Sequence, residues 1–173
     1  FNMTEMTDHI YSLFKKRAWD TAAWVGAGVE VSFNGQVIQE NTFKKYATMY
    51  IGGFKTYAHE VCDERWEIMA TYNSNEVFEQ YSFVNGINTV RGGKHVEYIV
   101  DQICEKMIVE IKKSHKMEIK KPYVKNQLMV FVKSIIVNPS FDGQTKETLT
   151  TIKRKFGSEC IVSDAFIKQL AKT

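Results

Sequence analysis

The residues best suited to chemistry lie in two polar segments, of which the first covers residues 138–147. It reads Asn-Pro-Ser-Phe-Asp-Gly-Gln-Thr-Lys-Glu and directly follows an apolar stretch. A lysine on a loop held by a rigid strand can set three donors against a terminal phosphate, and the amide of Gln144 can bond a phosphate oxygen or an attacking water. The alternative is a polar turn in which Asp142 and Gly143 form the bend and Lys146 faces solvent. The spacing alone leaves both interpretations open.

The second segment runs from Lys112 to Lys133 and is strongly basic. It contains seven lysines and a single acid, Glu118, so its local charge is +6. The 173 residues together carry only +3. Such lysines can neutralise phosphates, and each contact makes binding more sensitive to salt. Few base-reading or stacking groups accompany them, so contact with duplex DNA would be to the backbone and independent of sequence. The alternative is a solvated loop whose lysines complement a helix dipole.

Other sequence features are weaker candidates. The run Arg91-Gly92-Gly93-Lys94 lacks the glycine spacing of a phosphate-binding fingerprint and fits a turn that begins a helix better. The four histidines form no pair at metal-ligand spacing, and no local set of nucleophile and base is found. The three distant cysteines (Cys62, Cys104 and Cys160) predict reduced thiols and an intracellular protein. No apolar run has the length of a signal peptide or a membrane span.

The first half of the chain must supply a sheet. Apolar spacing predicts a helix over 8–23 with Asp8 as its N-cap. Asn34-Gly35 between short alternating runs predicts a β-hairpin over 29–38, and a short helix follows over 42–50. Three strands are then expected, over 54–61, 66–72 and 77–84, the second with Trp66, Ile68, Ala70 and Tyr72 on one face.

The second half holds the elements that would position the two polar segments. A stripe of apolar residues predicts the longest helix over 94–113, and the apolar run 127–137 predicts a buried strand. A strand, a long helix and a second buried strand suggest a βαβ crossover, and a last helix should begin at Ser163 or Asp164 and end at Leu170. The expected class is therefore α+β or mixed α/β.

Three runs together resemble one protein family. They are residues 82–98 (Ser-Phe-Val-Asn-Gly-Ile-Asn-Thr-Val-Arg-Gly-Gly-Lys-His-Val-Glu-Tyr), residues 138–147, and Phe156-Gly157-Ser158. In this order they closely resemble the transducer domain of eukaryotic-type type IIA DNA topoisomerases. Shorter blocks at residues 14–18, 64–67 and 124–126 fit the same alignment, so the resemblance covers nearly the whole chain.

The resemblance implies a fold and a place in a larger enzyme. The fold would be α+β, like the second domain of ribosomal protein S5: a sheet covered by helices, with a left-handed βαβ crossover, preceded by a helix and a hairpin. Residues 1–173 would form one transducer domain between an upstream GHKL ATPase domain and a downstream DNA-cleaving core. The full enzyme would be a homodimer that uses ATP and Mg²⁺, located in the nucleus or, if viral, in the virion or at the replication site.

The family's functional residues carry over position by position. Gln144, Thr145 and Lys146 would form a loop that reaches the γ-phosphate of ATP. The basic loop would contact DNA through Lys112, Lys113, Ser114 and Lys116. No catalytic residue of the family falls within the chain, which alone should be inactive.

The chain also departs from the family's usual pattern. Gly143 and Gly86 each stand where the family has a serine, and the loop over 115–122 is short, so the DNA contacts at Ser114 and Lys116 carry over less directly. Two alternatives to this function are a stand-alone basic nucleic-acid-binding module and the transducer of another GHKL ATPase, such as a mismatch-repair protein.

Overall fold

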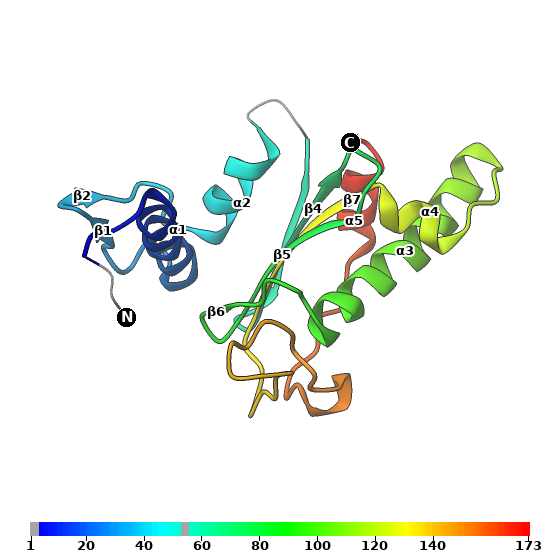
Figure 1. Ribbon diagram of the computed structural model, residues 1–173. Coiled ribbons are helices and arrows are strands. Elements are labelled where there is room, and N and C mark those ends of the chain that lie inside the picture. Colours follow the sequence, from blue (N-terminus) through cyan, green and yellow to red (C-terminus); the bar gives the residue numbers. More distant parts are fainter. Residues whose placement is uncertain (1–3, 53–55) are drawn as a thin grey trace. The chain divides into compact units, whose positions relative to one another are not determined.

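The computed structural model describes residues 4–52 and 56–173, which form two compact units (Figure 1). The first unit ends at Tyr50 and the second begins at Ile51. No described helix is long and apolar enough to cross a membrane.

The first unit contains two helices and a hairpin. Helix α1 (Asp8–Val25) begins at the N-cap Thr7, one residue before the predicted cap, and α2 covers Phe43–Ile51. Strands β1 (Ser32–Phe33) and β2 (Gln36–Val37) pair through a tight turn in which Asn34 and Gly35 both have positive φ, as the Asn-Gly signal predicts. Tyr11 and Trp19 of α1 contact the ring of Phe33 at centroid distances of 5.4 and 6.4 Å, which docks the hairpin on the helix.

The second unit is built on a mixed five-stranded sheet in the order β3-β4-β7-β5-β6. Its strands are β3 (Ala58–Asp63), β4 (Trp66–Tyr72), β5 (Glu79–Val84), β6 (Ile87–Asn88) and β7 (Leu128–Ser134). Strand β7 pairs antiparallel with β4 and parallel with β5, and the parallel pair is joined through α3 (Lys94–His115). The predicted βαβ unit is therefore confirmed; the handedness of its crossover stays a prediction.

Helices α3, α4 (Lys121–Asn126) and α5 (Asp164–Leu170) lie on one side of this sheet (Figure 1). One hydrophobic cluster joins them to β4 and β7, and its members include Trp66, Ile68, Ala70, Val130, Val132, Ile99, Ile103, Phe166 and Ile167. The predicted inward face of β4 is confirmed at its first three positions, whereas Tyr72 at the strand end is exposed.

The structure also differs from the sequence-based expectations in the bounds of β3, in the basic stretch and at two cysteines. Strand β3 covers Ala58–Asp63 where the sequence predicts 54–61, and positions 54 and 55 of that prediction lie outside the described residues. The basic stretch after α3 contains a short helix, α4, because Pro122 occupies an early position where a helix tolerates proline and Val124 is buried. Cys62 and Cys160 are joined by a disulfide with their Cα atoms 5.4 Å apart, so the prediction of three reduced thiols is wrong for this pair. The two residues are 98 positions apart in sequence, and only the return of the chain beside β3 brings them together.

Candidate functional site

The segment with Gln144, Thr145 and Lys146 is a loop fixed to the start of α3. After β7, the chain forms isolated bridges between Phe141 and Leu149 and between Leu149 and Gly93, the residue that precedes α3. Leu149 donates its N–H to the carbonyl of Gly92 (3.0 Å) and accepts from Lys94 N (3.0 Å). The loop is therefore held at its base by the helix that follows β6 (Figure 1, orange loop).

Gly93 permits this close approach. Its φ is +130°, and a Cβ atom at this position would lie only 2.3 Å from the carbonyl oxygen of Leu149. Only glycine fits such a position without a backbone shift. The glycines between Arg91 and Lys94 thus form the turn that begins the helix, as the sequence favoured, and also seat the base of the loop.

Hydrogen bonds also order the loop internally. Asp142 N donates to Thr148 O and Thr148 N to Asp142 Oδ1, both at 3.1 Å, and Lys146 N donates to Gly143 O at 3.1 Å. The hydrogen bonds from Thr148 lower the pKa of Asp142, so its carboxylate stays charged. Lys146 itself adopts a left-handed conformation, with φ of 57°. The predicted bend at Asp142 and Gly143 is present, and it is closed across its base.

The side chains of this loop differ in what they contact. Gln144 and Thr145 are exposed. The ammonium of Lys146 lies 5.9 Å from the centroid of the Phe141 ring, and no ion pair within 4 Å joins it to an acid among the described residues. The nearest acid in sequence, Glu147, is bonded to Arg91 at 2.9 Å. The Lys146 ammonium is therefore not engaged by an acid among the described residues, and Gln144 lies in the same turn.

The predicted DNA-contacting residues lie at the other end of α3. Lys112 forms an ion pair with Glu118 (2.8 Å), and the hydroxyl of Ser114 donates to the carbonyl of Glu110. Lys116 ends the helix in a left-handed conformation, and Lys113 is exposed. A helix of this length spans about 33 Å, so the structure does not bring these residues to the loop of Lys146.

The basic stretch is divided among several environments. Lys121 pairs with Asp101 (2.9 Å) and Glu105 (3.5 Å), and Lys133 lies on β7, 4.0 Å from Glu67. Burial lowers the pKa of Lys133. The local charge of +6 is therefore not one continuous patch, because acids distant in sequence neutralise part of it.

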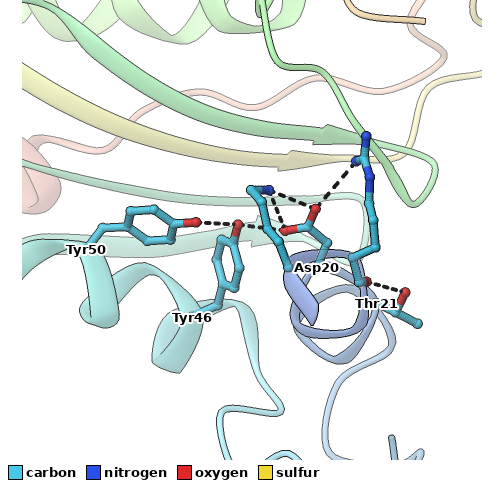
Figure 2. Close-up of polar contacts among 6 residues, drawn as sticks. Asp20, Thr21, Tyr46 and Tyr50 are labelled. Atoms are coloured by element: carbon cyan, nitrogen blue, oxygen red, sulfur yellow. Dashed lines mark hydrogen bonds and ion pairs between the residues drawn. The ribbon is translucent and has the colours of Figure 1, made fainter. Parts of the chain in front are cut away.

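The sequence reasoning missed two polar networks. In the first unit, the buried Asp20 accepts two hydrogen bonds from Lys16 (both 2.9 Å) and one from the hydroxyl of Tyr46 (2.8 Å), which also bonds Tyr50 (2.9 Å; Figure 2). Arg17 lies 3.5 Å from the same carboxylate, and burial raises the pKa of Tyr46. The i, i+4 spacing of Lys16 and Asp20 was the available signal. This network ties α1 to α2.

The second network is buried at the start of α3. Thr89 Oγ1 lies 2.6 Å from Ser82 Oγ and 3.2 Å from His95 Nε2, and all three residues are fully buried. Burial lowers the pKa of His95 to about 3, so its imidazole is neutral. Within residues 4–52 and 56–173, no group of three or more acidic, histidine or cysteine side chains could hold a metal ion.

The amino-acid sequence is similar to those of known DNA topoisomerases. The family model described as DNA gyrase B matches residues 32–173. The chain is 38% identical over 182 residues to DNA topoisomerase 2 of Arabidopsis thaliana and 42% identical over 177 residues to DNA topoisomerase 2-beta of Gallus gallus. These alignments cover 100% and 97% of the chain, but only 12% and 11% of the relatives' length.

Solved structures agree with the sequence comparison. The ATPase and transducer domains of DNA topoisomerase II from Balamuthia mandrillaris superpose with a TM-score of 0.89 at 37% identity, covering 98% of this chain and 43% of that one. The ATPase region of Saccharomyces cerevisiae topoisomerase II gives 0.88 at 35% identity, covering 99% and 44%. The predicted resemblance and fold class are confirmed, and the chain belongs to the DNA gyrase B family, as a relative of the eukaryotic type II DNA topoisomerases.

Proposed function

We propose that the chain is the transducer module of an ATP-dependent type II DNA topoisomerase. In this proposal, it couples ATP binding and hydrolysis to closure of the N-terminal gate and passage of one duplex through a break in another. Support comes from the similar relatives, which are DNA topoisomerases 2. The chain spans about 12% of the length of the relative from Arabidopsis thaliana. The rest of such an enzyme would include a GHKL ATPase domain and a cleavage core, and the enzyme would act as a homodimer in the nucleus. The relatives favour this function over that of a mismatch-repair transducer.

The observation that carries the proposal is Lys146 on its fixed loop. The loop is bonded to the beginning of α3, and no acid among the described residues pairs with the lysine. Lys146 can therefore donate to the γ-phosphate of ATP, with the Gln144 amide as a second donor and Thr145 between them. The described residues offer no cluster of acids for Mg²⁺, so the metal would be held by the ATPase domain and the nucleotide.

A charge-assisted contact of this kind can report the state of the nucleotide. While the terminal phosphate is present, Lys146 holds the transducer against the ATPase domain, and loss of the phosphate removes the partner of the lysine. Such a contact contributes about 1.5–3 kcal/mol, which suffices to bias an equilibrium between two domain arrangements. Because the loop is bonded to α3, a shift of the loop is transmitted to the sheet and helices of the second unit.

The test is Lys146→Ala in the complete enzyme. ATP hydrolysis and strand passage should fall roughly tenfold or more, because the lost contact is worth more than about 1.4 kcal/mol. DNA cleavage should remain, since the chain contributes no residue to it. Lys168→Ala, which removes an exposed lysine on α5, is the matched control and should behave like the wild type. Normal DNA-stimulated ATP turnover in Lys146→Ala would overturn the proposal.

The proposal also includes a DNA-contacting role for the end of α3. Lys113 and Lys116 are exposed, and neither forms an ion pair within 4 Å with an acid among the described residues. Lys112 must exchange its partner Glu118 for a phosphate, which lowers its net contribution. Ser114 must give up its hydrogen bond to the carbonyl of Glu110 before its hydroxyl can donate to a phosphate. These contacts would be to the backbone of duplex DNA and independent of sequence.

A further inference from the structure

A second basic site, which neither the resemblance nor the comparisons assign, lies beyond the end of β7. Residues 137–140 and 150–155 form the walls of an open pocket of about 600 Å³. Its polar lining consists of Asn138, Ser140, Thr150, Thr151 and Lys155. None of these residues belongs to the loop of Gln144, Thr145 and Lys146 or to the basic end of α3.

The two walls of this pocket are fixed to each other. Val137 N donates to Phe156 O (3.0 Å), Ser140 N to Thr151 Oγ1 (2.7 Å), and Thr150 N to Ser140 O (2.9 Å). Phe156 is fully buried and packs against Trp66 and Tyr98 with ring centroids 5.7 and 5.9 Å apart. The pocket is thus formed before any ligand arrives, which reduces the entropic cost of binding.

The groups left over in the pocket are mainly hydrogen-bond donors. The Thr151 oxygen accepts from Ser140 N, so its hydroxyl proton remains to donate. The hydroxyl of Ser140, the amide of Asn138 and the ammonium of Lys155 have no hydrogen-bond partner within the described part of the chain. A ligand that complements this set must present several acceptors.

The charged residues around the pocket also favour an anionic ligand. Residues 150–156 contain three cations and no acid. Lys153 is directed elsewhere, with its ammonium 4.8 Å from the Tyr98 ring centroid and 3.9 Å from Glu159. Arg154 and Lys155 are exposed and form no ion pair within 4 Å with an acid among residues 4–52 and 56–173. The site is therefore positive as well as rich in donors.

We propose that this pocket binds a phosphodiester group of a DNA backbone, with Lys155 as the counter-ion and Ser140, Thr151 and Asn138 as neutral donors. Arg154, beside the pocket, contacts the next phosphate of the strand. The openness of the site and the cation beside it favour a continuous polyanion over an isolated phosphate ion. This inference rests on the proposed function for its source of phosphate, and it adds a DNA contact at the opposite end of α3 from Lys112.

The experiment is a titration of the 173-residue chain with a short DNA duplex at several salt concentrations. Lys155→Gln should weaken binding on the order of threefold to tenfold at low salt and reduce the slope of log K against log[salt] by about 1. Lys153→Gln is the matched control, since it removes the same charge from the same turn but from a side chain directed at Tyr98 and Glu159. Ser140→Ala should weaken binding without changing the slope. Thermal melts check that each variant is folded.

The outcomes separate this inference from the proposed function. If Lys112→Ala/Lys113→Ala/Lys116→Ala weakens DNA binding and Lys155→Gln does not, the pocket proposal fails alone. If Lys155→Gln and Lys153→Gln reduce the slope equally, a diffuse field is responsible and the pocket proposal again fails. Titration with inorganic phosphate, followed by amide shifts of Ser140 and Thr151, tests the source: saturation at low millimolar concentration, abolished by Lys155→Gln, would replace DNA by free phosphate and overturn the proposal.

Discussion

The lysines of this chain differ in the partners that their ammonium groups contact. Lys112 lies in the basic stretch and Lys146 in the polar segment 138–147. Lys112 is paired with Glu118 at 2.8 Å, whereas the ammonium of Lys146 lies 5.9 Å from the Phe141 ring centroid and pairs with no acid among the described residues. An exposed ion pair contributes roughly 0–1 kcal/mol, so Lys112 can be released by a phosphate at little cost. Lys146 has no such ion pair to exchange among the described residues, which is consistent with the phosphate-sensing role that we propose for it.

His95 provides a pH-dependent test at the same scale. Its pKa is about 3 in the folded chain against 6.5 as the ordinary value. Between pH 6.5 and 3 the unfolded chain binds a proton at His95 that the folded chain does not. The contribution of this group to the unfolding free energy is therefore complete above pH 6.5 and decreases as the pH is lowered, by up to about 1.4 kcal/mol per pH unit. Urea unfolding at several pH values from 6.5 to 5 measures the slope of the unfolding free energy against pH. This slope should be smaller by about 1 kcal/mol per pH unit in His95→Gln than in the wild type. Ser82→Ala, which keeps the imidazole, should retain the slope; a His95→Gln slope like the wild type would contradict the buried neutral histidine.

Gly93 should be the glycine that tolerates substitution worst at the base of the loop. A Cβ there would meet Leu149 O at 2.3 Å with φ at +130°, so Gly93→Ala should cost about 2–4 kcal/mol of unfolding free energy. Gly143, in the same loop, has nothing within 4 Å of a built Cβ and no positive φ, so Gly143→Ala should change stability by less than about 1 kcal/mol. Chemical denaturation measures both. Equal effects would show that the bridge to Leu149 is not tight.

At the scale of elements, the apolar periodicity of the sequence predicts individual helices and strands but not the contacts between residues that are far apart in the chain. The helix ending at His115 and the strand β4 were predicted to within two residues, since their apolar faces repeat at 3.6 and 2 residues. The parallel pairing of β5 with β7 follows from the βαβ pattern. The Tyr46–Asp20 hydrogen bond, the Cys62–Cys160 pair and the acids that neutralise Lys121 depend on contacts between distant elements, which no spacing rule reveals. The sequence motif predicts a loop over 138–147, whereas the close contact of Leu149 with Gly93 joins segments that are distant in sequence.

The link between β3 and the segment before α5 gives a test at this scale. The disulfide leaves Cys104 as the free thiol of the chain, and burial raises the pKa of Cys104 to about 11. Thiol titration in denaturant should therefore find one thiol without reductant and three after reduction. Closing a loop of 98 residues should stabilise the fold by about 4–5 kcal/mol, which reductant removes. Cys62→Ala should be insensitive to reductant. Three free thiols in the unreduced chain would contradict the link.

At the scale of the molecule, a net charge of +3 conceals separate functional ends. Residues 112–133 carry +6, so the rest of the chain carries −3, but pairing within the fold removes part of that contrast. Lys113 and Lys116, at the end of α3, are among the cations that form no ion pair with an acid in the described part of the chain. The loop of Lys146 lies at the opposite end of the same helix (Figure 1). Helix α3 thus joins the loop that we propose to sense the nucleotide to the end that we propose to contact DNA, and it is the element through which we expect coupling to travel.

The salt dependence of DNA binding tests that arrangement. Lys112→Ala/Lys113→Ala/Lys116→Ala should reduce the slope of log K against log[salt] by about 2, not by the 2.7 expected from three full contacts at about 0.9 each, because Lys112 is already neutralised by Glu118. A control that replaces Lys15, Lys168 and Lys172 with alanine changes the net charge equally at other exposed positions and should alter the slope less. Fluorescence anisotropy with one duplex at several salt concentrations measures both variants. Equal slopes in the two variants would mean that DNA binding depends on the total charge of the chain. The end of α3 would then have no specific role.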